Sequence, residues 1–130
     1  MIVVDASALF EALVGGSPPR SLSSRLFGPD QALHAPHLID LEIANAMRRY
    51  VSIGQINATR ARVAFEDLAD LRLRRYPHDF LLPRIWELRN NLTAYDAAYI
   101  ALAEFLGAPL LTCDERLARS PGHAARVELA

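Results

Sequence analysis

Short apolar runs alternate with longer stretches of helical spacing along this chain, and this alternation restricts the possible folds most. The runs are residues 2–4 (IVV), 32–36 (ALHAP) and 109–113 (PLLTC), with extended segments also expected at 72–79 and around 126–129. Unbroken apolar runs of this length are typical of strands that are covered on both faces. Because helices separate them, the strands should pair in parallel through right-handed crossovers. We therefore predict an α/β fold, a three-layer α/β/α sandwich with a short, mostly parallel sheet.

Stretches with apolar residues at helical intervals connect these runs. They cover residues 6–14, 37–54, 57–71, 80–92 and 92–107, with a shorter one at 114–120. Asn57 is a natural helix cap, and Gly54 and Gly107 are natural stops. Residues 15–21 (GGSPPRS) are expected to form a loop, because Gly-Gly and Pro-Pro interrupt regular structure. With 130 residues, no internal repeat and no longer linker, the chain is expected to be one domain over residues 1–130.

Composition and charge exclude several classes of protein. The chain is 52% hydrophobic and 22% charged, which is typical of a globular protein, and no apolar run reaches the ~18 residues of a membrane-spanning helix. The opening MIVVD enters an apolar run without the basic start of a signal peptide, and the single Cys113 cannot form an internal disulfide. We therefore expect a cytoplasmic protein with no membrane partner. A net charge of −1 excludes a nucleic-acid binder that relies on bulk positive charge.

Four acids should meet at one edge of the predicted sheet. Asp5 directly follows the first strand and Asp114 directly follows the strand LLTC. Glu42 lies early in the helix after the second strand, and Asp96 lies in the first turn of the helix that leads back into LLTC. In a parallel sheet these positions are all at the carboxyl ends of the strands, where folds of this kind place their sites.

Each of these acids also has a structural explanation. Asp5 and Asp114 could cap the helices that follow them. Asp96 stands three residues after Thr93, close to the capping-box pattern, and a carboxylate in a first helical turn gains roughly 0.3–1 kcal/mol from the helix dipole. Glu42 is the hardest to explain in this way, because large apolar residues flank it. A buried carboxylate without a partner is costly, so Glu42 should have a cation beside it.

The chemistry of four converging carboxylates is narrow, because they raise one another's pKa unless a cation stands among them. Mg²⁺ and Mn²⁺ prefer oxygen ligands, and such a site suits hydrolysis of a phosphodiester bond. Ser7 and Thr112, each two residues from an acid, could orient the ligands by hydrogen bonds, or could be ordinary cap and turn hydroxyls. Zinc is not expected, because one cysteine and four histidines without paired spacing do not form a zinc site, and the histidines are expected at the surface or in loops.

Four motifs, in this order, carry a family resemblance: IVVDASAL, HAPHLIDLEIANAMRR, LTAYDAAYIALAEFLG and LLTCDERLA. With them the chain resembles the PIN-domain ribonucleases over essentially its whole length, and most closely the VapC toxins of type II toxin–antitoxin systems. The resemblance implies an acidic catalytic quartet that binds Mg²⁺ or Mn²⁺, which matches Asp5, Glu42, Asp96 and Asp114. It also implies accompanying hydroxyls at Ser7 and Thr112, endonucleolytic cleavage of RNA, a homodimer, and inhibition by a small antitoxin that itself binds DNA.

Arginines are the candidates for contacts with an RNA substrate. All 14 cationic residues are arginine, whose side chain grips phosphate in a bidentate fork, although biased coding composition explains the missing lysine equally well. The candidates are Arg48, Arg49, Arg72, Arg74, Arg75, Arg84, Arg89 and Arg116, and Arg116 is the first choice because it lies just beyond Asp114. Tyr95 could stack on a base, although a tyrosine in an apolar helix more often belongs to the core. Asp40 is expected to face solvent or an edge.

Two other functions compete with a nuclease. An aspartyl phosphatase or phosphoacceptor domain also places Asp at carboxyl strand ends beside Mg²⁺, but those families generally have a lysine near the phosphoryl group, and the phosphatase pattern has a second Asp where Ser7 stands. A catalytically inactive PIN-like interaction module would use the acids as caps and partner contacts. The complete quartet argues against this module, and substitutions that neutralise the acids would separate the two functions.

Overall fold

A five-stranded sheet organises the computed structural model, which describes residues 1–16 and 20–130. The strands are β1 (Ile2–Val4), β2 (Leu33–Pro36), β3 (Leu73–Tyr76), β4 (Leu110–Thr112) and β5 (Val127–Leu129). Their order is β3-β2-β1-β4-β5 and every pairing is parallel, with Val3 opposite His34 on one side and Leu110 on the other. The prediction of a short, mostly parallel sheet is confirmed. β1 therefore lies at the centre of the sheet.

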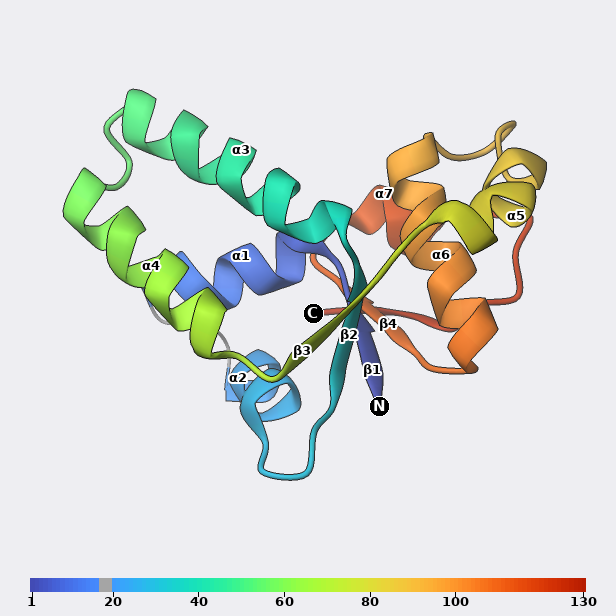
Figure 1. Ribbon diagram of the computed structural model, residues 1–130, viewed down its shortest axis with the longest axis horizontal. Coiled ribbons are helices and arrows are strands. Elements are labelled where there is room, and N and C mark those ends of the chain that lie inside the picture. Colours follow the sequence, from blue (N-terminus) through green and yellow to red (C-terminus); the bar gives the residue numbers. More distant parts are fainter. Residues whose placement is uncertain (17–19) are drawn as a thin grey trace.

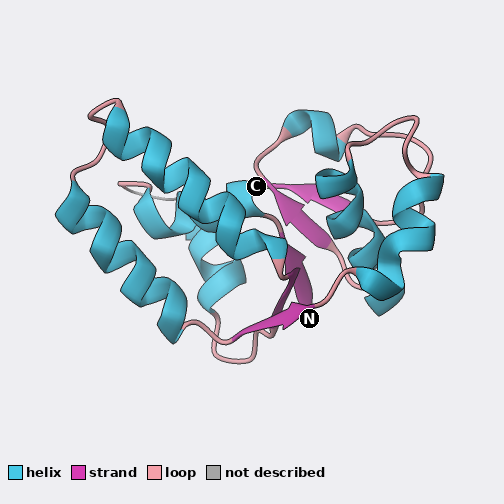
Figure 2. Cartoon of the chain, turned by 45° about the horizontal axis from the view of Figure 1, so that its top comes forward, coloured by secondary structure: helices cyan, strands magenta, loops and turns pink. Residues whose placement is uncertain are grey.

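Helices cover both faces of this sheet, as Figure 1 and Figure 2 show. One group consists of α1 (Ala6–Val14), α2 (Arg20–Phe27), α3 (Leu38–Ser52) and α4 (Ala58–Asp70). The other consists of the 3₁₀ turn η1 (Asp79–Leu81), α5 (Leu82–Glu87), α6 (Ala94–Leu106) and α7 (Glu115–Ala118). Helices α3 and α4 pack against each other and against α1, and together they extend away from the sheet (Figure 1). This arrangement confirms the three-layer α/β/α sandwich.

Local sequence signals explain where the main helices begin and end. Asn57 caps α4, because its side-chain oxygen accepts a hydrogen bond from the Arg60 amide at 2.7 Å. Thr93 caps α6 in the same way, accepting from the Asp96 amide at 3.2 Å. Gly107 ends α6 in the left-handed conformation with φ of 61°, which glycine adopts without a steric penalty. These caps fix the residues at which α4 begins and at which α6 begins and ends.

Helix α6 forms most of one layer. All seven residues from Ala97 to Ala103 are buried, and four of the seven are alanine. Small side chains allow the helix to pack closely on β1, β2 and β4, while Ile100 and Leu102 fill the layer between them. Burial of a side chain of that size contributes about 1.5–3 kcal/mol. This packing places the first turn of α6 at the carboxyl edge of the sheet.

Three expectations are wrong in detail. The helix expected at 80–92 ends at Glu87, after which the chain turns through Asn90 and Asn91, residues that compete with helical hydrogen bonding. The loop expected at 15–21 is shorter, because α2 begins at Arg20, and residues 17–19 lie outside the described residues. Histidines were expected at the surface, but His34 is buried on β2, where Nδ1 lies 2.7 Å from the Tyr76 hydroxyl. Within the described residues, no helix is long and apolar enough to cross a membrane.

Candidate metal centre

The four predicted acids lie around the carboxyl edge of the sheet. Asp5 follows β1 and Asp114 follows β4, and these two strands are neighbours. Glu42 is on α3, which starts after β2, and Asp96 is in the first turn of α6. The structure thus gathers all four acids from four separate segments into one region.

Asp5 is the most buried of the four, with 6% of its surface exposed. Its Oδ1 accepts hydrogen bonds from the Ser7 hydroxyl at 2.7 Å and the Ala8 amide at 3.0 Å, and its Oδ2 accepts from the Thr112 hydroxyl at 2.5 Å. Burial raises the pKa of Asp5, the three hydrogen bonds oppose that rise, and the nearby charge of Asp96 adds to it. The Ala8 bond also makes Asp5 the cap of α1, as predicted.

Ser7 and Thr112 connect the segments that carry the acids. The Ser7 hydroxyl accepts a hydrogen bond from the Cys113 amide at 2.9 Å, and the Thr112 hydroxyl accepts from the Asp114 amide at 3.0 Å. Since both hydroxyls also donate to Asp5, they hold its carboxylate in one orientation and tie the start of α1 to the end of β4. Sequence reasoning placed these two residues correctly beside the acids but left their partners open.

Glu42 has a partner that the sequence analysis missed. The Tyr99 hydroxyl donates a hydrogen bond to Glu42 Oε1 at 2.6 Å, and the Tyr99 side chain is almost fully buried. Burial raises the pKa of Glu42, the Tyr99 bond opposes this, and the charges of Asp96 and Asp5 raise it further. Burial and the charge beside it raise the pKa of Tyr99, so the phenol stays protonated and donates. Local sequence carried no signal for this contact, because Tyr99 lies 57 residues from Glu42.

Asp96 and Asp114 form the outer part of the site. Burial and the charge of Asp114 raise the pKa of Asp96, while Arg116 and the Thr93 hydroxyl oppose the rise. Asp114 caps α7, since its Oδ1 accepts from the Arg116 amide at 2.9 Å. The Arg116 guanidinium lies 3.4 Å from Asp114 Oδ2 and is 88% exposed. Arg116 therefore neutralises part of the acidic region, and its predicted contact with RNA would require it to leave this ion pair.

The donor set fits a hard divalent cation in its chemistry. All four side chains offer carboxylate oxygens, and neighbouring carboxylates raise the pKa of three of them: Asp96 acts on Asp5, both of these act on Glu42, and Asp114 acts on Asp96. A cation placed among them would relieve that repulsion. In the described part of the chain, no group of three or more His, Cys, Asp or Glu side chains is already positioned to hold a metal ion. The acids therefore share a region and would have to rotate inward to share one ion.

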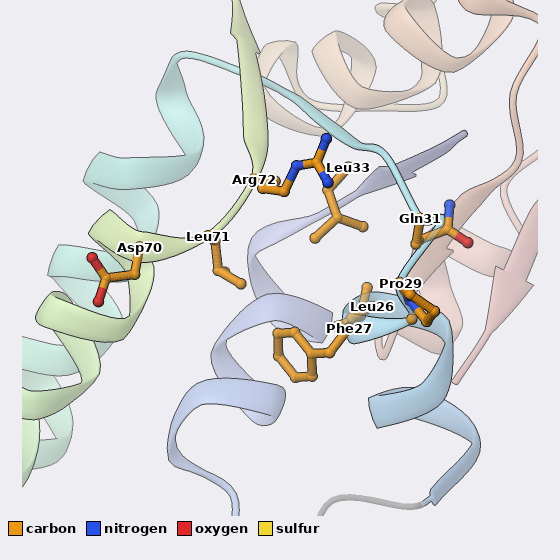
Figure 3. A pocket seen from close by; sticks show the side chains of 9 residues that line it. Leu26, Phe27, Pro29, Gln31, Leu33, Asp70, Leu71 and Arg72 are labelled. Carbon is orange, nitrogen blue, oxygen red and sulfur yellow. The ribbon is translucent and has the colours of Figure 1, made fainter.

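Two hollows adjoin this region. The larger, of about 510 Å³, is lined by Ser7, Glu42, Asn45 and Arg49 among others, and the smaller, of about 390 Å³, also contains Glu42 and Asn45. A third pocket, of about 310 Å³, lies at the opposite, amino end of the sheet, where Leu33 starts β2 (Figure 3). Figure 3 shows apolar side chains around that pocket together with Gln31, Asp70 and Arg72, and none of the four acids lines it.

Other residues singled out from the sequence have definite positions. Asp40 accepts a bidentate pair of hydrogen bonds from Arg75, at 2.6 and 2.9 Å, which gives it a structural role at the β3 edge. Arg84 is engaged in the same manner by Glu104, at 2.8 and 3.0 Å. Tyr95 is 66% exposed, so its expected place in the core is wrong. It lies on the outer side of α6, next to the acidic region.

Comparison with known proteins places the chain in a family. The PIN domain family model matches residues 2–122. The VapC ribonuclease Mb0985 of Mycobacterium bovis is 45% identical over 117 residues, which cover 90% of this chain and 88% of the relative. Ribonuclease VapC1 of Mycobacterium tuberculosis is 42% identical over 128 residues, which cover 98% of this chain and 96% of the relative.

A solved structure agrees in fold. The crystal structure of VapBC2 from Rickettsia felis, bound to a DNA fragment from their promoter, aligns with a TM-score of 0.71 over 99% of this chain and 98% of that chain. At 13% identity this similarity concerns the fold alone. The family match over residues 2–122 and the identities above 40% lead to one conclusion: the chain belongs to the PIN-domain family and, within it, to the VapC ribonucleases.

Proposed function

We propose that this protein is a Mg²⁺- or Mn²⁺-dependent endoribonuclease and the toxin of a toxin–antitoxin pair, built as one PIN-like domain and acting in the cytoplasm. The observation that carries the proposal is the gathering of Asp5, Glu42, Asp96 and Asp114 at one sheet edge, where neighbouring carboxylates raise the pKa of Asp5, Glu42 and Asp96. Membership in the VapC ribonucleases supports RNA as the substrate. Hydrolysis of a phosphodiester bond is the chemistry that such a donor set serves.

In the proposed mechanism the four acids hold the metal. When bound, the metal would supply an activated water and neutralise charge on the phosphate. The residues of the chain prepare that site: the Ser7 and Thr112 hydroxyls keep Asp5 oriented and favour its charged form, and Tyr99 does the same for Glu42. These hydrogen bonds oppose the effect of burial on the pKa of Asp5 and Glu42, so they favour the charged forms that would bind a cation.

Growth and RNA ends test this function together. The wild type, Asp96→Asn and the control Asp67→Asn are expressed from an inducible promoter in a bacterium, and new RNA 5′ ends are mapped by sequencing. Asp67 is an exposed acid on α4 outside the acidic region. We expect growth arrest and discrete new ends with the wild type and Asp67→Asn, and neither with Asp96→Asn. Arrest by all three proteins with identical RNA ends would show that cleavage does not need Asp96 and would contradict the proposed metal site. Arrest without new RNA ends in any of them would favour an interaction module with inert acids.

An antitoxin partner is part of the proposal, and the groove between α3 and α4 suits it. The groove has a volume of about 550 Å³ and is lined by Met47, Val51, Ala61 and Phe65, with Arg48 at its rim. An apolar helix or extended segment of the antitoxin would bury these side chains, as in helix-in-groove recognition. The arginine would favour an acidic segment beside the apolar one.

A homodimer is also proposed, through a different surface. Phe80 and Phe105 pack edge to face with ring centroids 4.9 Å apart, and both are substantially exposed. Leu82 and Trp86, one helical turn apart on α5, are exposed as well. A contiguous apolar patch of this kind on a soluble domain indicates a protein contact.

Substitution of one phenylalanine on each surface tests the antitoxin surface and the dimer surface independently. Phe65→Glu should abolish binding of the purified cognate antitoxin and leave the mass of the toxin in light scattering unchanged. Phe105→Glu should convert the dimer to a monomer and leave antitoxin binding intact. If each variant instead had the effect expected of the other, both assignments would be wrong.

A further inference from the structure

One stripe along α3 joins the two hollows beside the acids. Both hollows contain Glu42 and Asn45; the smaller adds Leu38 and Leu41, and the larger adds Arg49. At about 100° per residue, positions 38, 42, 45 and 49 fall within roughly 60° of one another around the helix. Together with Leu41, which lies about 40° further round the helix, these positions form what we call the α3 track: Leu38, Leu41, Glu42, Asn45 and Arg49. The track places Glu42 between an apolar end and a basic end.

The apolar end has the character of a base-binding surface. Tyr95, from the first turn of α6, closes the smaller hollow opposite Leu41, and these side chains are 66% and 74% exposed. An exposed aromatic ring next to a hydrolytic site offers a face on which an unpaired base can stack. Asn45 lies in the same hollow, and its amide can both donate to and accept from the edge of a base.

The basic end has the character of a phosphate contact. Arg49 is the one cation among the described residues that line the larger hollow, and no ion pair of Arg49 is found within residues 1–16 and 20–130. Its guanidinium lies 5.9 Å from the Tyr50 ring centroid, which holds it over the hollow. It follows Glu42 by seven residues, about 10 Å along the helix axis. Glu11 and Glu42 face the same hollow, so Arg49 supplies the positive charge that a polyanion needs there.

We propose that a single RNA strand lies along the α3 track, with one base stacked on Tyr95 and contacted by Asn45, and with a phosphate on the far side of the cut bound by Arg49. The inference rests on the proposed ribonuclease function and adds the path of the substrate. It makes Tyr95 and Asn45 determinants of the cut site, and it makes Arg49 a determinant of affinity. Among the candidate arginines it selects Arg49 in place of Arg116.

The observations favour RNA over a protein on this surface. The track is continuous with the acids through Glu42, so an occupant of the track is placed for cleavage. Arg49, the one cation among the described residues that line the larger hollow, suits a bound phosphate, whereas the apolar patch around Phe80 and Phe105 has the composition of a protein contact. A second copy of the chain on Tyr95 and Leu41 is the competing occupant. The Tyr95 variants below distinguish such a dimer contact from RNA binding.

A distant arginine provides a matched control. Arg49 and Arg126 are both exposed, but Arg126 directly precedes β5 and forms an ion pair with Glu128, outside the acidic region and both partner surfaces. With a defined RNA substrate, Arg49→Gln should raise KM about ten-fold or more with kcat nearly unchanged, and it should lower the salt dependence of RNA binding by about one counterion. Arg126→Gln should leave KM unchanged. Equal effects of the two variants would show that only net charge matters and would overturn the track.

A tyrosine series tests the base-binding end. Tyr95→Ala should change the distribution of mapped cut sites and weaken binding about five-fold or more, whereas Tyr95→Phe should keep both because it keeps the ring. Binding of a labelled random single-stranded RNA to each protein in a chelator is measured in parallel, so the track is tested even if the wild type fails to cleave. Loss of dimer mass in Tyr95→Ala, with RNA binding unchanged, would instead identify this surface as a contact between copies and contradict the proposal.

Discussion

Thr112→Val is the substitution for which the structure gives the clearest magnitude. The Thr112 side chain is fully buried, and its hydroxyl donates to Asp5 at 2.5 Å and accepts from the Asp114 amide at 3.0 Å. A hydrogen bond to a charged group contributes about 1.5–3 kcal/mol, and a buried amide left without an acceptor costs about 1–3 kcal/mol. The two contributions involve the same side chain and are therefore not simply additive. We expect a loss of about 3 kcal/mol in the free energy of unfolding, with a melting temperature about 10 °C lower.

Urea unfolding in a chelator measures this loss without a metal contribution. Thr112→Ser is the control, because it keeps the hydroxyl and removes one methyl group, which should cost only about 1 kcal/mol. The excess loss in Thr112→Val should shrink at acidic pH, because the hydroxyl favours the charged form of Asp5 and lowers its pKa. If valine cost no more than serine at pH 7, the hydroxyl would not support Asp5 and the reasoning would be refuted.

Three further predictions follow from individual contacts. Burial and Asp114 raise the pKa of Asp96, so without metal the Asp96 carboxyl binds a proton more tightly in the folded state than in the unfolded chain. Asp96→Asn should therefore be more stable than the wild type at pH 7. This advantage should disappear as the pH falls toward about 4. Unfolding curves at the two pH values check this, and a difference independent of pH contradicts it. Tyr99→Phe should lower the free energy of unfolding by about 1.5–3 kcal/mol and weaken Mn²⁺ binding, because Glu42 loses its hydrogen-bond donor at 2.6 Å. Titration calorimetry measures the Mn²⁺ affinity, and an unchanged affinity would contradict this role of Tyr99. Asp40→Asn should lower the free energy of unfolding by roughly 1 kcal/mol, because the ion pair with Arg75 is lost. RNA cleavage should stay at the wild-type rate. A cleavage defect would mean that Asp40 belongs to the site.

The sheet and the position of the acids follow from sequence for a simple physical reason. Buried parallel strands must be apolar on both faces, so IVV and PLLTC are recognisable as strands, and the next residue of each chain segment must lie at the carboxyl edge. Asp5 and Asp114 are therefore placed by connectivity alone. The capping residues Asn57 and Thr93 are also local signals, since each bonds an amide three residues ahead.

The remaining features depend on contacts between distant segments. The Tyr99 bond to Glu42 spans 57 residues, and the Arg75 pair with Asp40 spans 35, so neither follows from local spacing. Tyr95 was expected inside because its neighbours in sequence are apolar, but the buried side of α6 faces the sheet and Tyr95 lies on the other side. The orientation of a helix around its axis is decided by what it packs against, and the sequence of a uniformly apolar helix leaves that orientation open.

The central claim is that Asp5, Glu42, Asp96 and Asp114 together hold the metal that cuts RNA. It is tested most directly by titrating purified wild type and the four single Asn or Gln variants with Mn²⁺, following bound Mn²⁺ by electron paramagnetic resonance and RNA cleavage in the same samples. We predict that the wild type binds Mn²⁺ and cleaves, and that each variant stays folded but loses both together. Wild-type Mn²⁺ affinity and cleavage in the Asp96→Asn protein would contradict the account.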